Sequence, residues 1–246
     1  VARLTECGLA AEPSALLPSR GVTVTTPVAV RDIPGFSDGL FFVQDGSGLL
    51  HGDVLDARPG DTTVDVCAAP GGKSFGAAFR MHDRGAVYAF DIHESKLSLI
   101  EDGARRLGLS SVRAAVRDAR EPDETLSGAA DRVICDVPCS GLGVLGGKPD
   151  LRYKDPAVWE TLPALGLLIL SASAAYVRPG GTLLYSTCTL AKRENRDVVD
   201  AFLAEHGDFS LSPFTVGTKM GADGTLTLLP HKDGTDGFYM AKLVRT

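Results

Sequence analysis

No stretch of the 246-residue sequence is apolar for long enough to span a membrane. The most apolar segment, residues 165–177, is interrupted by Gly166, Ser171 and Ser173. A charged-then-apolar leader is also missing, so secretion is not indicated and we expect a cytoplasmic protein. The chain begins at Val1 instead of Met, so we expect it to be a fragment of a longer protein.

Cysteine is too scarce for a disulfide framework. Five cysteines form an odd set in a chain long enough to fold without cross-links, which favours free thiols. Cys135 and Cys139 lack the spacing of a zinc-binding pair, and neither a second pair nor a His-x-x-x-His pattern follows them. We therefore predict that the chain binds no metal.

The balance of charge is acidic, with a formal net charge of −6. This argues weakly against a protein that coats nucleic acid without specificity, but it leaves room for a local basic rim. Ordinary solvated surface charge explains each basic cluster equally well. The clusters that could form a rim are Lys148, Arg152 and Lys154, and Lys192, Arg193 and Arg196.

Short β-rich runs alternate with helical patterns from about residue 60 onward. Residues 163–177 keep a helical spacing of apolar side chains, but Pro163 should break any helix that starts earlier. The tail predicts a hairpin of residues 225–229 and 238–243 with no helix between them. This order predicts an α/β fold, a doubly wound parallel sheet with an antiparallel element at its end. The other predicted strands are residues 62–67, 86–90, 112–117, 132–135 and 182–186, and the other predicted helices are 73–81, 94–107 and 191–205.

Residues 1–50 differ from the rest of the chain. They contain several prolines and a β-rich run at residues 21–30. This is too little for an independent core, so we expect part of an N-terminal module there and one larger domain over residues 51–246.

Residues that could bind a ligand or take part in catalysis follow each of the five predicted parallel strands. In open α/β sheets, ligands bind beyond the carboxyl ends of the strands. Five such positions on one edge are hard to explain as surface decoration, so we predict an enzyme. The positions are the turn at residues 67–73, Asp91, Asp118, Asp136 with Cys139, and Cys188.

The glycine-rich turn after the first strand resembles two phosphate-binding motifs but matches neither. A P-loop needs Gly where Cys67 stands, and the G-x-G-x-x-G order of dinucleotide sites is absent. A tight turn remains, in which N–H groups at the start of the next helix favour a carboxylate. Asp91 stands where an acid meets ribose hydroxyls, although it could instead cap the next helix. Asp118 could contact the base, or it could simply pair with neighbouring arginines. A turn for the amino-acid end, an acid for the ribose and a further polar residue for the base together predict S-adenosylmethionine as the cofactor.

Two cysteines stand at the ends of neighbouring strands and should face one pocket. Cys139 follows a proline that fixes the backbone, and Cys188 follows the fifth strand. Free cysteines are usually inert packing residues, which we accept for Cys67 and Cys135 inside strands. The residues alone do not decide whether Cys139 or Cys188 is the nucleophile.

Five motifs carry a family resemblance: DVCAAPGGKS, DVPCSGLGV, KPDLRYK, LLYSTCTL with ENRDVVDAFL, and TDGFYMAKL. In this order and spacing they resemble the Fmu/Sun (RsmB-type) RNA cytosine-5 methyltransferases of the NOL1/NOP2/Sun family. The likeness runs from about Phe36 to the C-terminus and is strongest to the bacterial enzymes acting on small-subunit ribosomal RNA. The segment FFVQDGSGLL also resembles the family's lead-in to the first strand.

The resemblance implies a Rossmann-like class I methyltransferase with a seven-stranded sheet. It would transfer a methyl group from S-adenosylmethionine to carbon 5 of a cytosine in 16S ribosomal RNA, through a covalent cysteine–cytosine intermediate. Cys188 would be the nucleophile, Cys139 would assist release, and Asp136 and Lys73 would support the catalytic site. Residues 1–50 would be part of an RNA-binding module, and we expect a monomer. The residues that would bind the cofactor are Cys67, Ala68, Ala69, Pro70, Gly71, Gly72, Lys73, Asp91, Asp118 and Asp136.

The chain departs from the family pattern in two places, and two other functions compete. Gly146 and Gly147 stand where the family often has basic residues, and the N-terminal helical RNA-binding domain is absent. The competing functions are a nicotinamide-dependent oxidoreductase, which the glycine pattern disfavours, and a non-catalytic RNA-binding or ribosome-assembly factor. The intact Cys139, Cys188 and Asp136 argue against the second.

Overall fold

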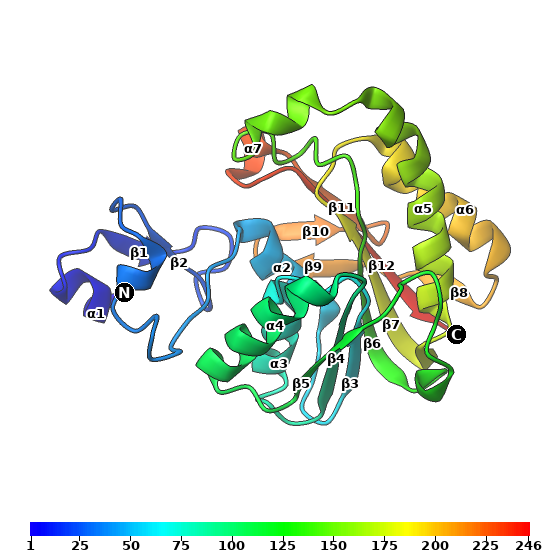
Figure 1. Ribbon diagram of the computed structural model, residues 1–246. Coiled ribbons are helices and arrows are strands. Elements are labelled where there is room, and N and C mark those ends of the chain that lie inside the picture. Colours follow the sequence, from blue (N-terminus) through cyan, green and yellow to red (C-terminus); the bar gives the residue numbers. More distant parts are fainter.

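The computed structural model describes residues 1–246, apart from the side chain of Val158. An eight-stranded sheet forms the centre of the molecule (Figure 1). Its strands are β3 (Thr62–Asp65), β4 (Ala86–Asp91), β5 (Val112–Val116), β6 (Ala130–Asp136), β7 (Val177–Thr187), β8 (Phe209–Leu211), β11 (Thr225–Leu228) and β12 (Phe238–Arg245). The helices are α1 (Ala2–Glu6), α2 (Gly46–Leu55), α3 (Gly72–Arg80), α4 (Glu94–Leu107), α5 (Pro156–Ala174), α6 (Arg196–Glu205) and α7 (Pro230–Asp233).

The order of the sheet is β11-β12-β7-β6-β3-β4-β5, with β8 paired to β12. The strands from β7 to β5 in this order run parallel, and β12 runs antiparallel to β7. All seven predicted strands are therefore present, and the antiparallel element at the C-terminal end is confirmed. β8 was not predicted. Since β12 runs downward in Figure 1, the carboxyl ends of the parallel strands meet at the top.

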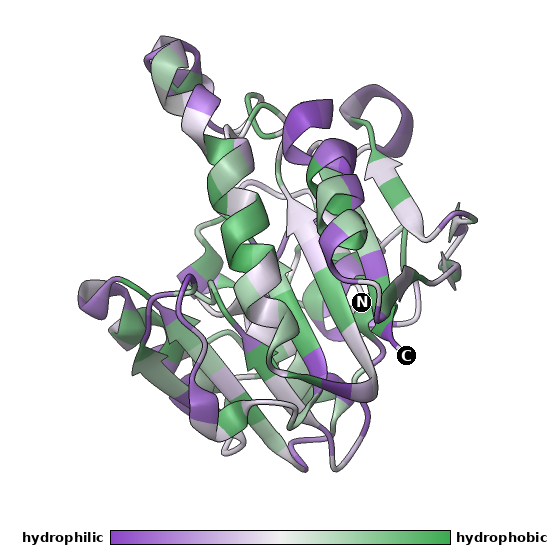
Figure 2. Cartoon of the chain, turned by 90° about the vertical axis from the view of Figure 1, so that its right-hand side faces the viewer, coloured by the Kyte–Doolittle hydropathy of each residue, from purple (hydrophilic) through white to green (hydrophobic). Residues whose placement is uncertain are grey.

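Helices cover both faces of the sheet. The cluster on one face joins α2, α3 and α4 to alternate strand residues such as Leu184 and Met240. On the other face, α5 and α6 pack on the strand residues that lie between these positions, such as Leu183 and Tyr185. Successive strand residues point to opposite faces, so each strand supplies both cores. Figure 2 shows mainly hydrophobic residues along α5 and the strands beneath it.

Two predictions about helices were wrong. Pro163 does not break the helix: α5 is continuous from Pro156 to Ala174, with Asp155 accepting a hydrogen bond from the N–H of Ala157 at its start. A proline removes one backbone hydrogen bond, and the buried packing of Ile169, Leu170 and Ala174 in the half of α5 that follows Pro163 offsets that loss. The tail hairpin contains a helix after all, because the short α7 lies between β11 and β12. By contrast, α4 has the predicted bounds and ends at Gly108.

The N-terminal part contains α1, two short strands and α2, and its first residues extend to one side of the sheet (Figure 1). The strands β1 (Ala11–Pro13) and β2 (Val22–Val24) pair with each other, as do β9 (Phe214–Val216) and β10 (Lys219–Gly221). Helix α2 was not predicted from the sequence. It spans the predicted boundary between residues 1–50 and 51–246 and packs on β7 and β12. The remaining elements are the 3-10 helices η1 (Val30–Asp32), η2 (Glu124–Leu126), η3 (Pro149–Tyr153) and η4 (Lys192–Glu194).

Candidate active site

The side chains of Cys139 and Cys188 meet at the carboxyl edge of the sheet. β6 pairs with β7 so that Asp136 lies opposite Ser186, and the two cysteines follow these residues along the chain. Their Sγ atoms are 3.3 Å apart. Both side chains are partly exposed, whereas Cys135 within β6 is buried. The structure thus brings together the two cysteines singled out from the sequence.

The two thiols of this pair differ in acidity. A hydrogen bond from Cys139 is the main cause that lowers the pKa of Cys188, and the charges of Lys73 and Lys148 lower it further. The same hydrogen bond, together with burial, raises the pKa of Cys139. Because a thiolate is the nucleophilic form of cysteine, this arrangement favours Cys188 as the attacking residue.

Lys73 and Asp136 form an ion pair beside the cysteines. Lys73 Nζ lies 2.7 Å from Asp136 Oδ2, and Ser186 Oγ donates to Asp136 Oδ1 over 2.6 Å. Burial lowers the pKa of Lys73, but the charge and hydrogen bond of Asp136 outweigh it and leave that pKa raised. Lys73 Nζ also lies 5.5 Å from the centre of the Phe238 ring. Lys73 is therefore held as a cation next to Cys188.

The glycine-rich turn connects β3 to α3 and lies against the end of β4. Ala68 N–H donates to the carbonyl of Phe90, and Ala69 N–H donates to Asp91 Oδ2 over 3.3 Å. Gly71 has a φ of 109°, which favours glycine, and a Cβ there would stand 2.4 Å from the Phe75 ring. The turn and Asp91 therefore form one structural unit.

The two acidic residues predicted to bind cofactor differ in their surroundings. Asp91 Oδ1 accepts a hydrogen bond from the N–H of His93, just before α4. Asp91 therefore also has the contact expected of a residue that caps this helix. Asp118 is bound by Arg120, which donates to both of its oxygens and lowers its pKa to about 2. The alternative role of Asp118, pairing with a neighbouring arginine, is therefore present in the structure.

A buried carboxylate that the sequence did not reveal joins the two cysteine loops. Glu194 accepts hydrogen bonds from the N–H and the hydroxyl of Ser140, both 2.7 Å long. Ser140 Oγ is also 2.7 Å from Thr189 Oγ1, and Tyr185 donates to the backbone carbonyl of Glu194. Ser140 follows Cys139 and Thr189 follows Cys188. The only sequence signal was the position of Glu194 inside a motif of the family resemblance.

Two other buried polar residues lie under the site and were also missed. His51 of α2 is fully buried, its ring nitrogens have no hydrogen-bond partner, and burial together with the charge of Lys73 lowers its pKa to about 3. Asp65 at the end of β3 accepts a 2.6 Å hydrogen bond from Ser74, and burial raises its pKa to about 7. No local pattern separates such residues from surface ones, because their burial depends on packing.

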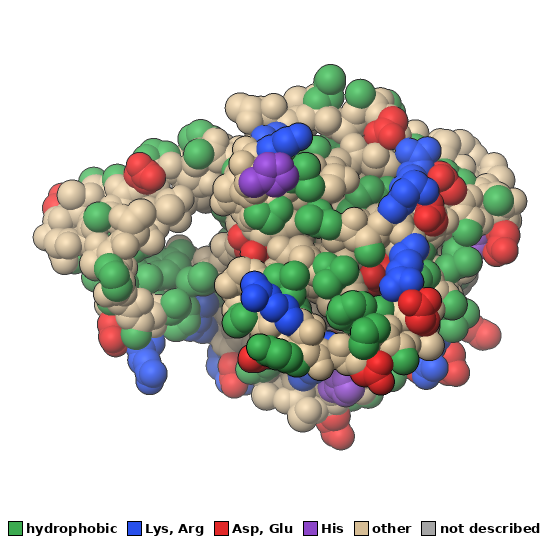
Figure 3. All heavy atoms as spheres, turned by 90° about the horizontal axis from the view of Figure 1, so that it is seen from above, with side chains coloured by type: hydrophobic (Ala, Val, Ile, Leu, Met, Phe, Trp, Pro, Cys, Tyr) green, Lys and Arg blue, Asp and Glu red, His purple; other side chains and the backbone are tan. Residues whose placement is uncertain are grey.

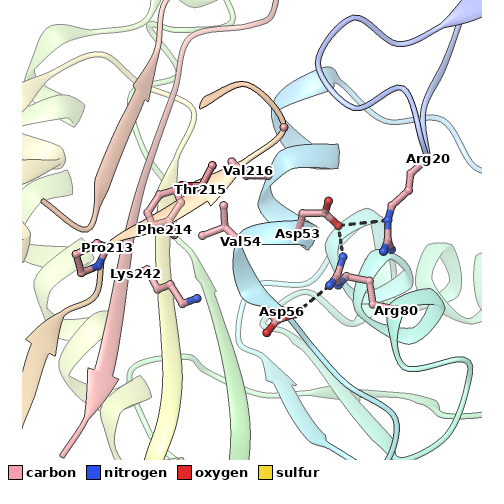
Figure 4. Close-up of a pocket in the computed structure, with 11 residues that line it drawn as sticks. Arg20, Asp53, Val54, Asp56, Arg80, Pro213, Phe214, Thr215, Val216 and Lys242 are labelled. Atoms are coloured by element: carbon pink, nitrogen blue, oxygen red, sulfur yellow. Dashed lines mark hydrogen bonds and ion pairs between the residues drawn. The ribbon is translucent and has the colours of Figure 1, made fainter. Parts of the chain in front are cut away.

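A cavity of about 430 Å³ lies between α2, β9 and β12, and none of the predicted site residues lines it. Figure 4 shows Arg80 between Asp53 and Asp56, with Arg20 also directed at Asp53. These ion pairs connect α3 to α2, so the charges in this cavity serve the fold.

Within the described residues, no three His, Cys, Asp or Glu side chains are grouped so that they could hold a metal ion. No described helix is both long and apolar enough to cross a membrane.

Comparison with known proteins matches this chain to ribosomal RNA methyltransferases. A family model described as 16S rRNA methyltransferase RsmB/F matches residues 53–244. The probable ribosomal RNA small subunit methyltransferase B of Bacillus subtilis is 40% identical over 222 residues, which cover 85% of this chain and 48% of the relative. This chain spans about half the length of the curated relatives it matches.

Two solved structures are similar along most of the chain. A methyltransferase homolog protein from Pyrococcus horikoshii has a TM-score of 0.86 and 26% identity, over 100% of this chain and 81% of that one. NSun6 from Pyrococcus horikoshii, crystallised with SFG, has a TM-score of 0.76 and 29% identity, over 92% and 60% of the two chains.

Proposed function

The chain belongs to the RsmB/F family of 16S rRNA methyltransferases, and from this we propose that it carries the catalytic site of such an enzyme. The reaction would transfer a methyl group from S-adenosylmethionine to carbon 5 of a cytosine in small-subunit ribosomal RNA. The RNA and its small-subunit origin come from the names of the family and its relatives. The choice of cytosine rests on the chemistry of the two cysteines.

The observation that carries this proposal is the 3.3 Å distance between the Sγ atoms of Cys139 and Cys188. Carbon 5 of cytosine is a poor nucleophile on its own. A thiolate that adds to carbon 6 removes the conjugation of the ring and makes carbon 5 nucleophilic. A second thiol in contact with the first fits a reaction in which the first must both attack and leave.

The glycine-rich turn and Asp91 fit S-adenosylmethionine. The first N–H groups of α3 have no acceptor within the helix, so they suit the cofactor's carboxylate. Asp91, bonded to the turn through Ala69, would accept the ribose hydroxyls. The bound cofactor supplies an electrophilic methyl group. The similar structure of NSun6, crystallised with SFG, supports a ligand site in this fold.

Cys188 would act first. Its thiolate adds to carbon 6 of a cytosine that has been unstacked and inserted into the site, and an S–C6 bond forms. The electron pair of the C5–C6 double bond then becomes available at carbon 5. A C5–CH₃ bond would form with it as the bond between the methyl group and the donor sulfur breaks, and S-adenosylhomocysteine would be the leaving group. Asp136, held by Lys73 and Ser186, would bind the polar edge of the ring.

Release would reverse the addition. A base takes the proton from carbon 5, the S–C6 bond breaks, and the C5–C6 double bond forms again. The departing sulfur becomes a thiolate, and the Cys139 S–H donates a hydrogen bond to it. Cys139 therefore favours the breakdown of the adduct.

Covalent trapping tests the proposal. Cys139→Ala protein mixed with S-adenosylmethionine and undermethylated small-subunit ribosomal RNA should accumulate a protein–RNA adduct that survives denaturing electrophoresis. The Cys139→Ala/Cys188→Ala protein should form none, and Cys135→Ala, which removes a buried thiol, should behave as the unchanged chain. An adduct that forms with Cys188→Ala protein but not with Cys139→Ala protein would reverse the two roles. Absence of an adduct and of methylated RNA from every variant would favour a non-catalytic RNA-binding factor.

A further inference from the structure

A short exposed strip lies between β6 and α5. It consists of Lys148, Arg152, Tyr153 and Lys154 and is called the η3 strip here, since η3 spans Pro149–Tyr153. The side chain of Tyr153 is 88% exposed, the highest value among the exposed large hydrophobic residues of the described chain. An aromatic ring this exposed gains nothing from the core and is free to stack on a partner.

The η3 strip adjoins the two cysteines. Leu151 of η3 packs on Gly141, two residues after Cys139, where an added Cβ would stand 2.8 Å from the Leu151 side chain. The same loop is bonded to the second cysteine, because Gly143 N–H donates to the carbonyl of Cys188 over 3.0 Å. The charge of Lys148 also contributes to the lowered pKa of Cys188. The η3 strip therefore lies at the margin of the active site.

The positive charges of the η3 strip have no ion-pair partner among the described residues. None of Lys148, Arg152 and Lys154 forms an ion pair within the described structure, although Lys148 attracts Asp236 at longer range. In the second basic cluster each cation is paired: Lys192 with Asp197, Arg193 with Glu160, and Arg196 with Asp200 and Asp223. The two clusters cannot be distinguished in the sequence. Of the two, only the cations of the η3 strip lack an ion-pair partner among the described residues of the structure, so they can bind anionic groups of a partner molecule.

Figure 3 looks down on the carboxyl edge of the sheet. Lysine and arginine side chains form separate small groups there among hydrophobic side chains, and several have acidic neighbours. The face is therefore not a continuous basic field. Recognition of a nucleic acid on it must depend on local combinations of charge and aromatic surface.

We propose that the η3 strip binds the single-stranded RNA next to the target nucleotide, with Tyr153 stacked on a flanking base and the three cations contacting phosphates. This inference rests on the proposed function, because it takes RNA as the substrate. An aromatic ring stacks on any base, and nearby cations follow the backbone, so the contact is tolerant of sequence. It holds the strand where an unstacked cytosine can reach Cys188.

Equilibrium binding of this chain to a single-stranded RNA of about 12 nucleotides with one cytosine tests the inference, as a function of salt concentration. Tyr153→Ala should raise the Kd roughly ten-fold or more, while Tyr153→Phe, which keeps the ring, should bind as the unchanged chain. The triple variant Lys148→Gln/Arg152→Gln/Lys154→Gln should reduce the slope of log K against log salt by about 2. The matched triple Lys192→Gln/Arg193→Gln/Arg196→Gln should leave the slope unchanged.

Kinetics separates this contact from a structural effect. At saturating RNA, Tyr153→Ala introduced into Cys139→Ala protein should form the covalent adduct at the rate of Cys139→Ala alone, and only the RNA concentration needed should rise. If Cys139→Ala protein forms the adduct and Tyr153→Ala binds RNA as well as the unchanged chain, the η3 strip inference fails while the proposed function stands. If the unchanged chain binds no RNA and Cys139→Ala protein forms no adduct, both fail.

Discussion

The carboxylate of Glu194 accepts two hydrogen bonds from Ser140, one from its backbone N–H and one from its hydroxyl, each 2.7 Å long. Glu194 belongs to η4, which follows β7, whereas Ser140 follows Cys139 in the loop after β6. Through Ser140 the carboxylate also reaches Thr189, the neighbour of Cys188. One buried group thus sets the relative position of the two cysteine loops.

Replacing this carboxylate should separate the cysteines without removing either. Glu194→Gln leaves a similar shape but directs an amide N–H₂ at one of the two Ser140 donors, so one charge-assisted hydrogen bond is lost. We expect a loss of about 1.5–3 kcal/mol in the free energy of unfolding, measured by urea denaturation. In Cys139→Ala protein, where the adduct accumulates, Glu194→Gln should also slow adduct formation, while binding of S-adenosylhomocysteine stays unchanged. The control, Glu160→Gln at the exposed surface, should change neither quantity appreciably.

The difference in acidity between the two thiols should appear in alkylation. Cys188 should react with iodoacetamide at lower pH than Cys139, because the Cys139 S–H stabilises its thiolate. In Cys139→Ala the labelling curve of Cys188 should move to higher pH. Mass spectrometry of peptides labelled across a pH series measures both, with the exposed Cys7 as internal reference. Preferential labelling of Cys139 would contradict the assignment of Cys188 as nucleophile.

The loop of Cys139 approaches two backbone carbonyls too closely for any side chain at Gly143. An added Cβ would stand 2.0 Å from the carbonyl oxygen of Gly237 and 2.8 Å from that of Cys188. Backbone cannot swing aside as a long side chain does, so Gly143→Ala should lose about 1–3 kcal/mol of stability. Gly146→Ala, in the same loop with nothing within 4 Å, should change stability by less than about 0.5 kcal/mol. Equal denaturation midpoints for the two variants would contradict this prediction and show that the loop can move to accept a side chain at residue 143.

The two candidate cofactor acids should differ in importance. Asp91→Asn should weaken S-adenosylhomocysteine binding by roughly ten-fold or more, because it removes a charged acceptor attached to the glycine-rich turn. Asp118→Asn should have a smaller effect, because Arg120 already binds both oxygens of Asp118. Isothermal titration calorimetry measures both. A larger loss at Asp118 would mean that Arg120 releases it when the cofactor binds.

Buried His51 should make the protein sensitive to acid. Burial, aided by the charge of Lys73, lowers the pKa of His51 to about 3, so the folded state keeps the ring neutral. The unfolded chain takes up a proton below about pH 6.5, and stability is therefore lost as the pH falls from 6.5 toward 3. At pH 4.5 this group alone should cost about 2–3 kcal/mol.

Urea denaturation at pH 7 and pH 4.5 measures this loss. His51→Leu should lose less stability between the two pH values than the unchanged chain, and exposed His231→Leu should match the unchanged chain. The same loss in His51→Leu would assign the acid sensitivity to other groups.

Local signals were sufficient for most elements of the sheet. Short β-rich runs predicted the seven strands of the main path, and the helical pattern ending at Gly108 predicted α4 with its observed bounds. The local signal failed at α5, which continues through Pro163. The half of the helix that follows this proline is buried against the sheet and α6, and the mostly exposed half before it begins at the Asp155 cap. Helix α2 was missed because the segment lacks an amphipathic face, and contacts with β7 and β12 bury it.

The sequence by itself determined the fold class, the edge of the sheet where the candidate site lies, and the two cysteines that stand there. These follow from the order of strands and helices, because the carboxyl ends of parallel strands must meet. Only the tertiary structure decided the 3.3 Å contact between Cys139 and Cys188, the ion pair of Lys73 with Asp136, and the role of Glu194. It also distinguished the paired basic cluster from the unpaired η3 strip. Each of these depends on distances between residues far apart in the chain, which side-chain packing sets and local sequence does not encode.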